Sequence, residues 1–258
     1  MVPPHPELNE GSDPRLARAP SFRFFPAAAP LGHFVEYLFC SDVPRQFASR
    51  VEAMRLPELQ AQLVFAVEEG NAFPGGVGLG DWLRASLFLQ PAHLQFIPIP
   101  GSIRYAVGAS LRPAGLRLLL PTGAECMTEA PLFALEDLWG TEARSLLERM
   151  VVAGAAEQRL ALLESYLQAR VRRVGVPSRP VSHAFDVIQA AQGELSTEQL
   201  ARACGCSSRT LRSLTMAEAG LAPKQIARIV RIRHALELLC DAGVPLSAAA
   251  ASSAFSDH

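Results

Sequence analysis

The spacing of hydrophobic positions changes about halfway along the chain. From residue 22 to about residue 111, short apolar runs are separated by Gly and Pro, a pattern that predicts β-strands. Residues 31–39 can begin as a helical turn, and the clearest strands are predicted at residues 62–67, 85–89, 94–99 and 103–107. Many short strands at this spacing are typical of a small barrel or sandwich.

Helical spacing begins at residue 113 and continues to the end of the chain. In residues 157–173 the apolar side chains Leu160, Leu163, Leu167 and Val171 form one stripe of a helix. Other helices are predicted over residues 113–120, 141–152, 183–192, 196–204, 207–219, 223–240 and 246–253.

Proline and glycine divide the chain into four predicted parts. The Pro-rich residues 1–20 read as a disordered leader, and residues 175–180 contain two prolines and a glycine. We therefore predict a leader at 1–20, a β-rich domain at 21–173, a linker at 174–182 and a helical domain at 183–258.

Residues 200–214 carry the most specific pattern in the chain, that of two helices joined by a tight turn. Ala201 is the small residue needed where two helices cross, and Gly205 tolerates the positive φ that the turn requires. Leu211 and Leu214, spaced i and i+3, are predicted to face inward together with Leu200. This pattern predicts a helix-turn-helix.

The positions that remain on the outer face of the second helix carry hydrogen-bond donors. Ser208, Arg209, Arg212 and Ser213 suit phosphates and base edges in a major groove. Ser207 precedes them and is predicted to be the N-cap, with phosphate contact as its second role. The outer face therefore predicts DNA binding.

The long helix that follows contains three arginines with divided roles. Glu237 lies four residues after Arg233, a spacing that suits an ion pair, and one arginine is expected to pack its stem and form that pair. Another is expected to contact the DNA backbone, and we assign Arg228 and Arg231 to the predicted interface.

Charge supports this assignment in the C-terminal part only. The whole chain has a net charge of -1, but residues 173–258 carry nine Lys and Arg against seven Asp and Glu, whereas residues 1–172 carry 15 against 18. Lys224 is the only lysine. Arginine suits bidentate contact with phosphate and guanine better than lysine does.

Composition predicts a globular, cytoplasmic protein. The 258 residues are 49% hydrophobic and 19% charged, and this length allows two domains with separate cores. Five cysteines at no framework spacing predict reduced thiols. Because no apolar run has the length of a membrane span or a signal peptide, we expect no membrane partner.

Signatures of catalysis and of metal binding are weak. Residues 75–80 are glycine-rich, but Asp81 stands where the third glycine of the phosphate-binding fingerprint belongs. Cys204 and Cys206 are too close for the usual zinc spacing, and we expect them to fill the corner between two helices. We therefore expect no enzyme, no catalytic residue, no metal and no cofactor; activity dependent on His93 is a remote alternative.

The C-terminal part resembles the DNA-binding domain of the AraC-type (AraC/XylS) transcriptional regulators over residues 183–258. The resemblance rests on residues 196–200 (STEQL), 207–211 (SSRTL), 220–223 (GLAP) and 254–257 (AFSD), with Arg231 and Ala235 on the long helix. It implies two helix-turn-helix units, joined by that helix, which read neighbouring segments of the major groove.

The second of these units departs from the family pattern. Leu246, Ala250 and Phe255 occupy its first helix and its turn, and the sequence ends at His258 before a second reading helix. Ala254 replaces the usual turn glycine. We therefore expect a C-terminally truncated domain that, as a monomer, binds DNA weakly and with little specificity.

A weaker resemblance covers the N-terminal part. Residues 25–26 (FP), 31–37 (LGHFVEY), 111–116 (LRPAGL) and 135–140 (LEDLWG) resemble a sensor-type domain found ahead of AraC-type modules. This resemblance implies a β-rich, cupin-like core with trailing helices. The expected fold class is α+β: this sensor domain, followed by an all-α double helix-turn-helix domain whose second unit is incomplete.

Together these patterns predict a sequence-specific, effector-responsive transcription regulator of the AraC type. The expected partners are promoter DNA, a small-molecule effector, a second copy of the chain in a homodimer and, by the resemblance alone, RNA polymerase. The alternative is an effector-binding or dimerisation protein with a vestigial, DNA-incompetent helix-turn-helix module, which would form inactive mixed dimers with an intact relative.

Overall fold

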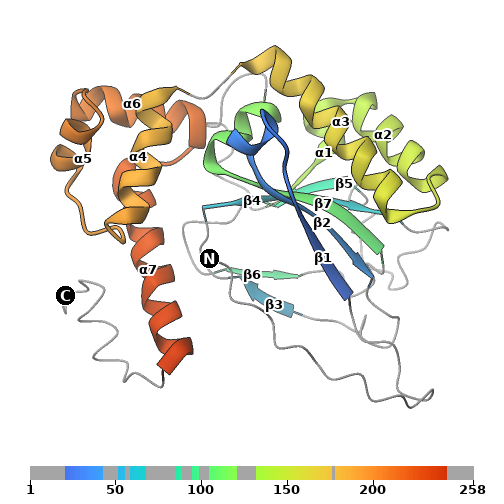
Figure 1. Cartoon of the computed structure of the whole chain (residues 1–258), viewed down its shortest axis with the longest axis horizontal. Helices are drawn as coiled ribbons and strands as arrows, with labels where there is room; N and C mark the ends of the chain where they lie inside the picture. Colours follow the sequence, from blue (N-terminus) through green and yellow to red (C-terminus); the bar gives the residue numbers. More distant parts are fainter. Residues whose placement is uncertain are drawn as a thin grey trace.

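Strands occupy the first part of the molecule and helices the second (Figure 1). The computed structural model describes residues 21–42, 52–55, 59–67, 85–88, 95–98, 105–120, 132–175 and 178–242. The predicted leader, the glycine run at 75–80 and the predicted second helix-turn-helix unit at 246–258 lie outside the described residues. We refer to the described residues up to 175 as the sheet unit, and to the described residues from 178 to 242 as the helical unit.

A six-stranded antiparallel sheet is the scaffold of the sheet unit. Its strand order is β1-β2-β7-β4-β5-β8, while β3 and β6 form a separate antiparallel pair. The strands are β1 (Ser21–Pro26), β2 (Val35–Asp42), β3 (Glu52–Arg55), β4 (Ala61–Ala66), β5 (Ala85–Phe88), β6 (Gln95–Pro98), β7 (Tyr105–Leu111) and β8 (Leu132–Ala134). In the view of Figure 1, α1–α3 lie above the sheet and the β3–β6 pair lies below it.

Alternate residues of the central strands bury one face of this sheet. Leu63 and Phe65 of β4 are fully buried, as expected where every second side chain of a strand faces a core. Three helices contribute to the same core: α1 (Leu135–Trp139), α2 (Thr141–Val152) and α3 (Ala156–Val174). The predicted stripe of α3 is confirmed, because its four leucine and valine side chains are all buried.

Short elements account for most of the differences from the sequence predictions. The predicted strands at 62–67, 85–89, 94–99 and 103–107 are confirmed, but β3, β8 and the short helix α1 were not singled out. The predicted helix at 113–120 is a 3₁₀ helix, η4 (Pro113–Leu118), and the turn expected near residue 31 is η1 (Leu31–His33). Segments this short are below the length at which hydrophobic periodicity separates one helix type from another.

Four helices form the helical unit around a second buried cluster. They are α4 (Arg179–Ala190), α5 (Thr197–Ala203), α6 (Ser208–Ala219) and α7 (Pro223–Ala242). Their core contains Ile188, Leu200, Leu211 and Ile226, and Leu59 of the sheet unit joins it.

The helix α4 begins at Arg179, whereas the sequence predicted a linker to residue 182 and a helix from residue 183. Pro180 explains the difference, because a proline in the first turn of a helix gives up a backbone N–H that has no intrahelical partner there. The described part of the chain contains no helix long and apolar enough to span a membrane. The cupin-like identity of the sheet unit and the division of the chain into four parts stay predictions.

Candidate nucleic-acid interface

The first helix of the motif, α5, begins at a cap that its own side chains form. The Oγ of Ser196 accepts a hydrogen bond from the backbone N–H of Gln199 at 3.2 Å, and the Gln199 side chain accepts one from the N–H of Ser196 at 2.9 Å. This reciprocal pair is a capping box, which satisfies two of the free N–H groups at a helix start. This cap fixes the start of α5 at Thr197, directly after Ser196.

A glycine makes the turn between α5 and α6. Gly205 has a φ of +65°, a conformation that is costly for residues with a Cβ, and no atom lies within 4 Å of where a Cβ would stand. Glycine is therefore needed at this position for its backbone angle and not for space. The role predicted for Gly205 is confirmed.

Two cysteine thiols flank this glycine. Cys204 and Cys206 are half-buried and pack against the core of the helical unit. Burial raises the pKa of the Cys204 thiol above its ordinary value, and the Cys206 thiol adds to the effect. Both side chains thus serve as the small apolar filling that the sequence predicted for this corner.

The second helix, α6, begins at Ser207 and ends at a left-handed glycine. The Oγ of Ser207 accepts a hydrogen bond from the N–H of Thr210 at 3.0 Å, so the predicted N-cap is confirmed. Gly220 closes the helix with a φ of +67°. These two ends define a helix whose first turns carry the predicted DNA-contacting side chains.

The buried side of α6 differs from the prediction at one position. Leu200, Ala201 and Leu211 are buried as predicted, but Leu214 is only half-buried, whereas Thr215 is fully buried. The i+4 position after Leu211 thus faces the core in place of the i+3 position. A threonine is tolerated there because its hydroxyl donates to the carbonyl of Arg212 at 3.2 Å. Leu214 is therefore removed from the predicted core.

The outer side of α6 presents the predicted donors together. Arg209, Arg212 and Ser213 are exposed, Ser207 is exposed at the cap, and Ser208 is half-buried. Among the described residues, neither the Arg209 nor the Arg212 side chain has a hydrogen-bond or ion-pair partner. Two unpaired guanidinium groups on the first turns of one helix form a surface suited to anions and to base edges.

The predicted contacts on α7 lie on a separate element, beside a cavity. Arg228 is exposed, and Arg231 is half-buried. Arg231 and Lys224 line a cavity of about 500 Å³ together with Ser196, at the start of α5. Lys224, Arg228 and Arg231 are spaced i, i+4 and i+7, so they follow one side of α7. We call these three residues the basic stripe.

Sequence reasoning missed Lys224 as a member of this stripe. Its spacing from Arg228, and its place as the only lysine of the chain, were signals that could have identified it. The third arginine of α7 has the other predicted role, because Arg233 lies 3.9 Å from the Glu237 carboxylate.

Comparison with known proteins identifies the same segment. Residues 200–258 match the model of a helix-turn-helix domain family of the AraC type. No curated protein and no solved structure matches the chain. The family match begins at Leu200 in α5 and continues through α6 and α7. The C-terminal part of the chain therefore contains a helix-turn-helix domain of the AraC type, and this match supports a DNA-binding transcription regulator.

Proposed function

We propose that this protein is a sequence-specific, effector-responsive regulator that places α6 in the major groove of promoter DNA. The observation that carries the proposal is the outer side of α6, where Arg209, Arg212 and Ser213 are exposed together just after the Ser207 cap. In helix-turn-helix proteins the first residues of the second helix reach the base edges. The match to the helix-turn-helix family favours this function over that of a vestigial module.

The side chains of α6 divide into base and phosphate contacts by their position. Arg209 and Arg212 stand one turn apart, and each can make a bidentate contact with the O6 and N7 of guanine. Ser207 and Ser208 lie at the helix start, where free backbone N–H groups favour a phosphate. We therefore assign sequence reading to the two arginines and orientation to the two serines.

The basic stripe of α7 supports the second half of the interface. Phosphate contacts fix the register of a protein on DNA but carry no sequence information. Arg228 is exposed and free of partners among the described residues, and Lys224 is exposed in the first turn of α7. We assign phosphate contact to Lys224, Arg228 and Arg231.

The experiment that tests this proposal compares selected with mixed DNA. A duplex is first selected from a random-sequence library by the full chain, and binding is then measured by fluorescence anisotropy against that duplex and against sheared, mixed-sequence DNA. Arg209→Ala should weaken binding to the selected duplex by about tenfold and relax its preference at one base pair. Arg228→Ala should weaken binding to both DNAs alike.

Arg172→Ala is the matched control, because it removes one exposed arginine from α3 and so changes the net charge equally. A library from which no sequence is enriched, or an Arg209→Ala variant that behaves like the control on both DNAs, would refute sequence reading by α6.

The sheet unit is proposed as the part that receives a signal. Its buried cluster is separate from that of the helical unit, and it contacts that unit through η4 and Leu59. We propose that it binds a small-molecule effector or a second copy of the chain, and that the regulator acts in the cytoplasm by binding and not by catalysis. The family resemblance supports RNA polymerase as a further partner.

A further inference from the structure

The 3₁₀ helix η4 lies between the rest of the sheet unit and α6. It follows β7 directly, and α6 packs against it more extensively than against α7. Its six residues exceed the three or four that are usual for a 3₁₀ helix. The element that contacts α6 from outside the helical unit is thus conformationally unusual.

One ion pair crosses this contact. The guanidinium of Arg117, in η4, lies 3.8 Å from the carboxylate of Glu218, in the last turn of α6. Glu218 is only 7% exposed, and the same carboxylate accepts a hydrogen bond from the N–H of Ser178, the N-cap of α4, at 3.4 Å. A buried carboxylate therefore connects η4, α4 and α6 at one point.

The charge of Glu218 makes α6 depend on Arg117. Negative charge is unfavourable at a helix C-terminus, where the backbone carbonyls already carry partial negative charge. Glu218 lies one residue before the end of α6, so its carboxylate opposes the dipole unless a cation stands beside it. With Arg117 in place the last turn of α6 is stabilised, and without it the turn loses that support.

The buried side of α6 near its C-terminal end contains polar residues. Thr215 and Glu218 are buried beside Ala219, whereas a permanently buried helix face is normally apolar. Contacts between domains that separate reversibly are more polar than permanent ones. The charged pair Arg117–Glu218 at this contact is therefore consistent with an interface between domains that can separate.

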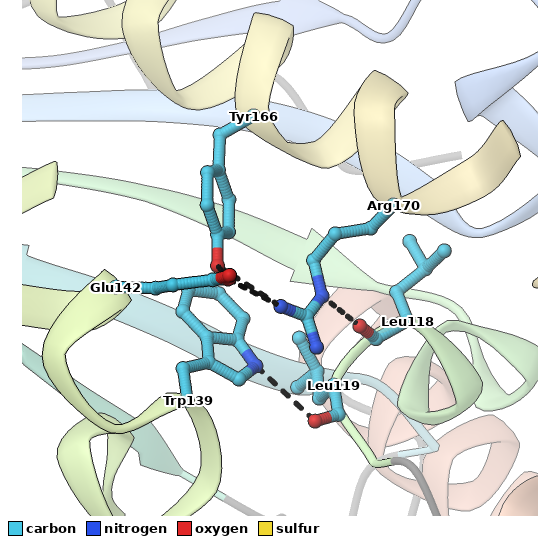
Figure 2. A network of polar contacts seen from close by, with 6 residues as sticks. All are labelled: Leu118, Leu119, Trp139, Glu142, Tyr166 and Arg170. Atoms are coloured by element: carbon cyan, nitrogen blue, oxygen red, sulfur yellow. Dashed lines mark hydrogen bonds and ion pairs between the residues drawn. The ribbon is translucent and has the colours of Figure 1, made fainter. Parts of the chain in front are cut away.

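The end of η4 is held by a polar network in the sheet unit (Figure 2). The Nε of Arg170, in α3, donates to the carbonyl of Leu118, and the indole N–H of Trp139 donates to the carbonyl of Leu119 at 3.1 Å. Arg170 also donates to the hydroxyl of Tyr166 at 2.9 Å. A change in the packing of α1 or α3 against the sheet therefore acts directly on η4.

We propose that η4 couples the sheet unit to DNA binding, and that the Arg117–Glu218 ion pair is the latch that holds α6 ready to bind. This inference rests on the proposed function. The contact between η4 and α6 leaves Arg209 and Arg212 exposed, so it does not cover the outer side of α6 that we assign to DNA. It restricts the motion of α6 before DNA arrives, and a preorganised helix binds more tightly than a mobile one. Displacement of η4 by a ligand of the sheet unit lowers the affinity for DNA.

A double-mutant cycle in the full chain tests the latch. The chain and its Arg117→Ala, Glu218→Gln and double variants are titrated against the selected duplex by fluorescence anisotropy. Arg117→Ala should weaken binding by about fivefold in the natural background. It should have no further effect in the Glu218→Gln background, because the ion pair is already absent there.

Arg144→Ala is the matched control, since it breaks an exposed ion pair with Glu136 in the sheet unit and removes the same charge. Hydrogen exchange provides a second measurement in the absence of DNA. The backbone amides of residues 215–219 should exchange faster in Arg117→Ala than in Arg144→Ala, and DNA should slow exchange in η4 of the unsubstituted chain.

The outcomes separate the latch from the function on which it rests. If the unsubstituted chain binds no duplex DNA, the proposed function fails. If it binds and Arg117→Ala binds as tightly as Arg144→Ala, or more tightly than the unsubstituted chain, the coupling alone is refuted. Equal losses from Arg117→Ala in both backgrounds would also refute the latch, since they would show that Arg117 acts without Glu218.

Discussion

At the scale of single residues, small polar side chains define the start of α6 and part of its inner side. Ser207 caps its start, and Thr215 replaces the leucine that the periodic pattern predicted in the core. Threonine is smaller and more polar than leucine, but the Thr215 hydroxyl forms a hydrogen bond to the carbonyl of Arg212 within the helix. The inner side of α6 is therefore less apolar than its sequence pattern indicates.

This arrangement predicts unequal effects for two leucines of α6. Leu211→Ala should lower the free energy of unfolding by about 3 kcal/mol, because Leu211 is fully buried and its loss leaves a cavity. Leu214→Ala should cost about 1 kcal/mol or less, since its side chain is half-buried. Urea unfolding followed by circular dichroism measures both. Equal losses of unfolding free energy in the two variants would show that Leu214 is part of the core.

At the scale of elements, the network around α3 explains how η4 is held in place. The hydroxyl of Tyr166 donates to the carboxylate of Glu142, in α2, at 2.6 Å, and Arg170 lies 3.3 Å from the same carboxylate. Burial, aided by the hydrogen bond to Glu142, raises the pKa of Tyr166 to about 12. The neutral phenol is thus the form that the folded structure favours.

The raised pKa of Tyr166 predicts a loss of stability in alkali. Below the ordinary tyrosine pKa of about 10, the phenol is neutral in both the folded and the unfolded chain, and the stabilisation is complete. Between about pH 10 and 12 only the unfolded chain ionises, so the free energy of unfolding falls as the pH rises.

Urea unfolding at several alkaline pH values measures this slope, and Tyr166→Phe is the control that should reduce it. A Tyr166→Phe variant with an unchanged slope between these pH values would contradict the raised pKa of Tyr166.

Some helix ends and turns could be predicted from the sequence, whereas contacts between distant elements could not. The start of α6 and the turn at Gly205 were predictable because a serine cap and a left-handed glycine are local signals. The pairing of Arg117 with Glu218 was not, because it joins residues far apart in sequence whose approach depends on the docking of two units. The start of α4 was missed because Pro180 is compatible with both a linker and a first helical turn.

At the scale of the whole molecule, charge is distributed unevenly between the two units. The chain has a net charge of -1, whereas residues 173–258 carry two more Lys and Arg than Asp and Glu. DNA approach is therefore favoured on the helical unit and not on the sheet unit. Within the helical unit, the basic stripe of α7 and the outer side of α6 supply the exposed cations of the proposed interface.

The basic stripe predicts how DNA affinity depends on salt. Lys224→Gln and Arg228→Gln should each reduce the slope of log affinity against log salt concentration by about 0.9, because each removes one phosphate contact. Arg149→Gln, on the exposed side of α2, should leave the slope unchanged. Anisotropy titrations on mixed-sequence DNA at several salt concentrations provide the measurement. Slopes that fall equally in all three variants would show that net charge, and not the stripe, sets the dependence.

The contacts of Trp139 have an optical consequence. Its indole N–H is bonded at the end of η4, and the guanidinium of Arg170 lies over its ring at 4.8 Å from the centroid. Indole emission responds to both a neighbouring cation and a change in hydrogen bonding. The chain has two tryptophans, so Trp82→Phe would leave Trp139 as the single tryptophan, beside the end of η4. Trp139 emission in that variant would show, without a label and before any operator is known, whether a screened compound displaces η4.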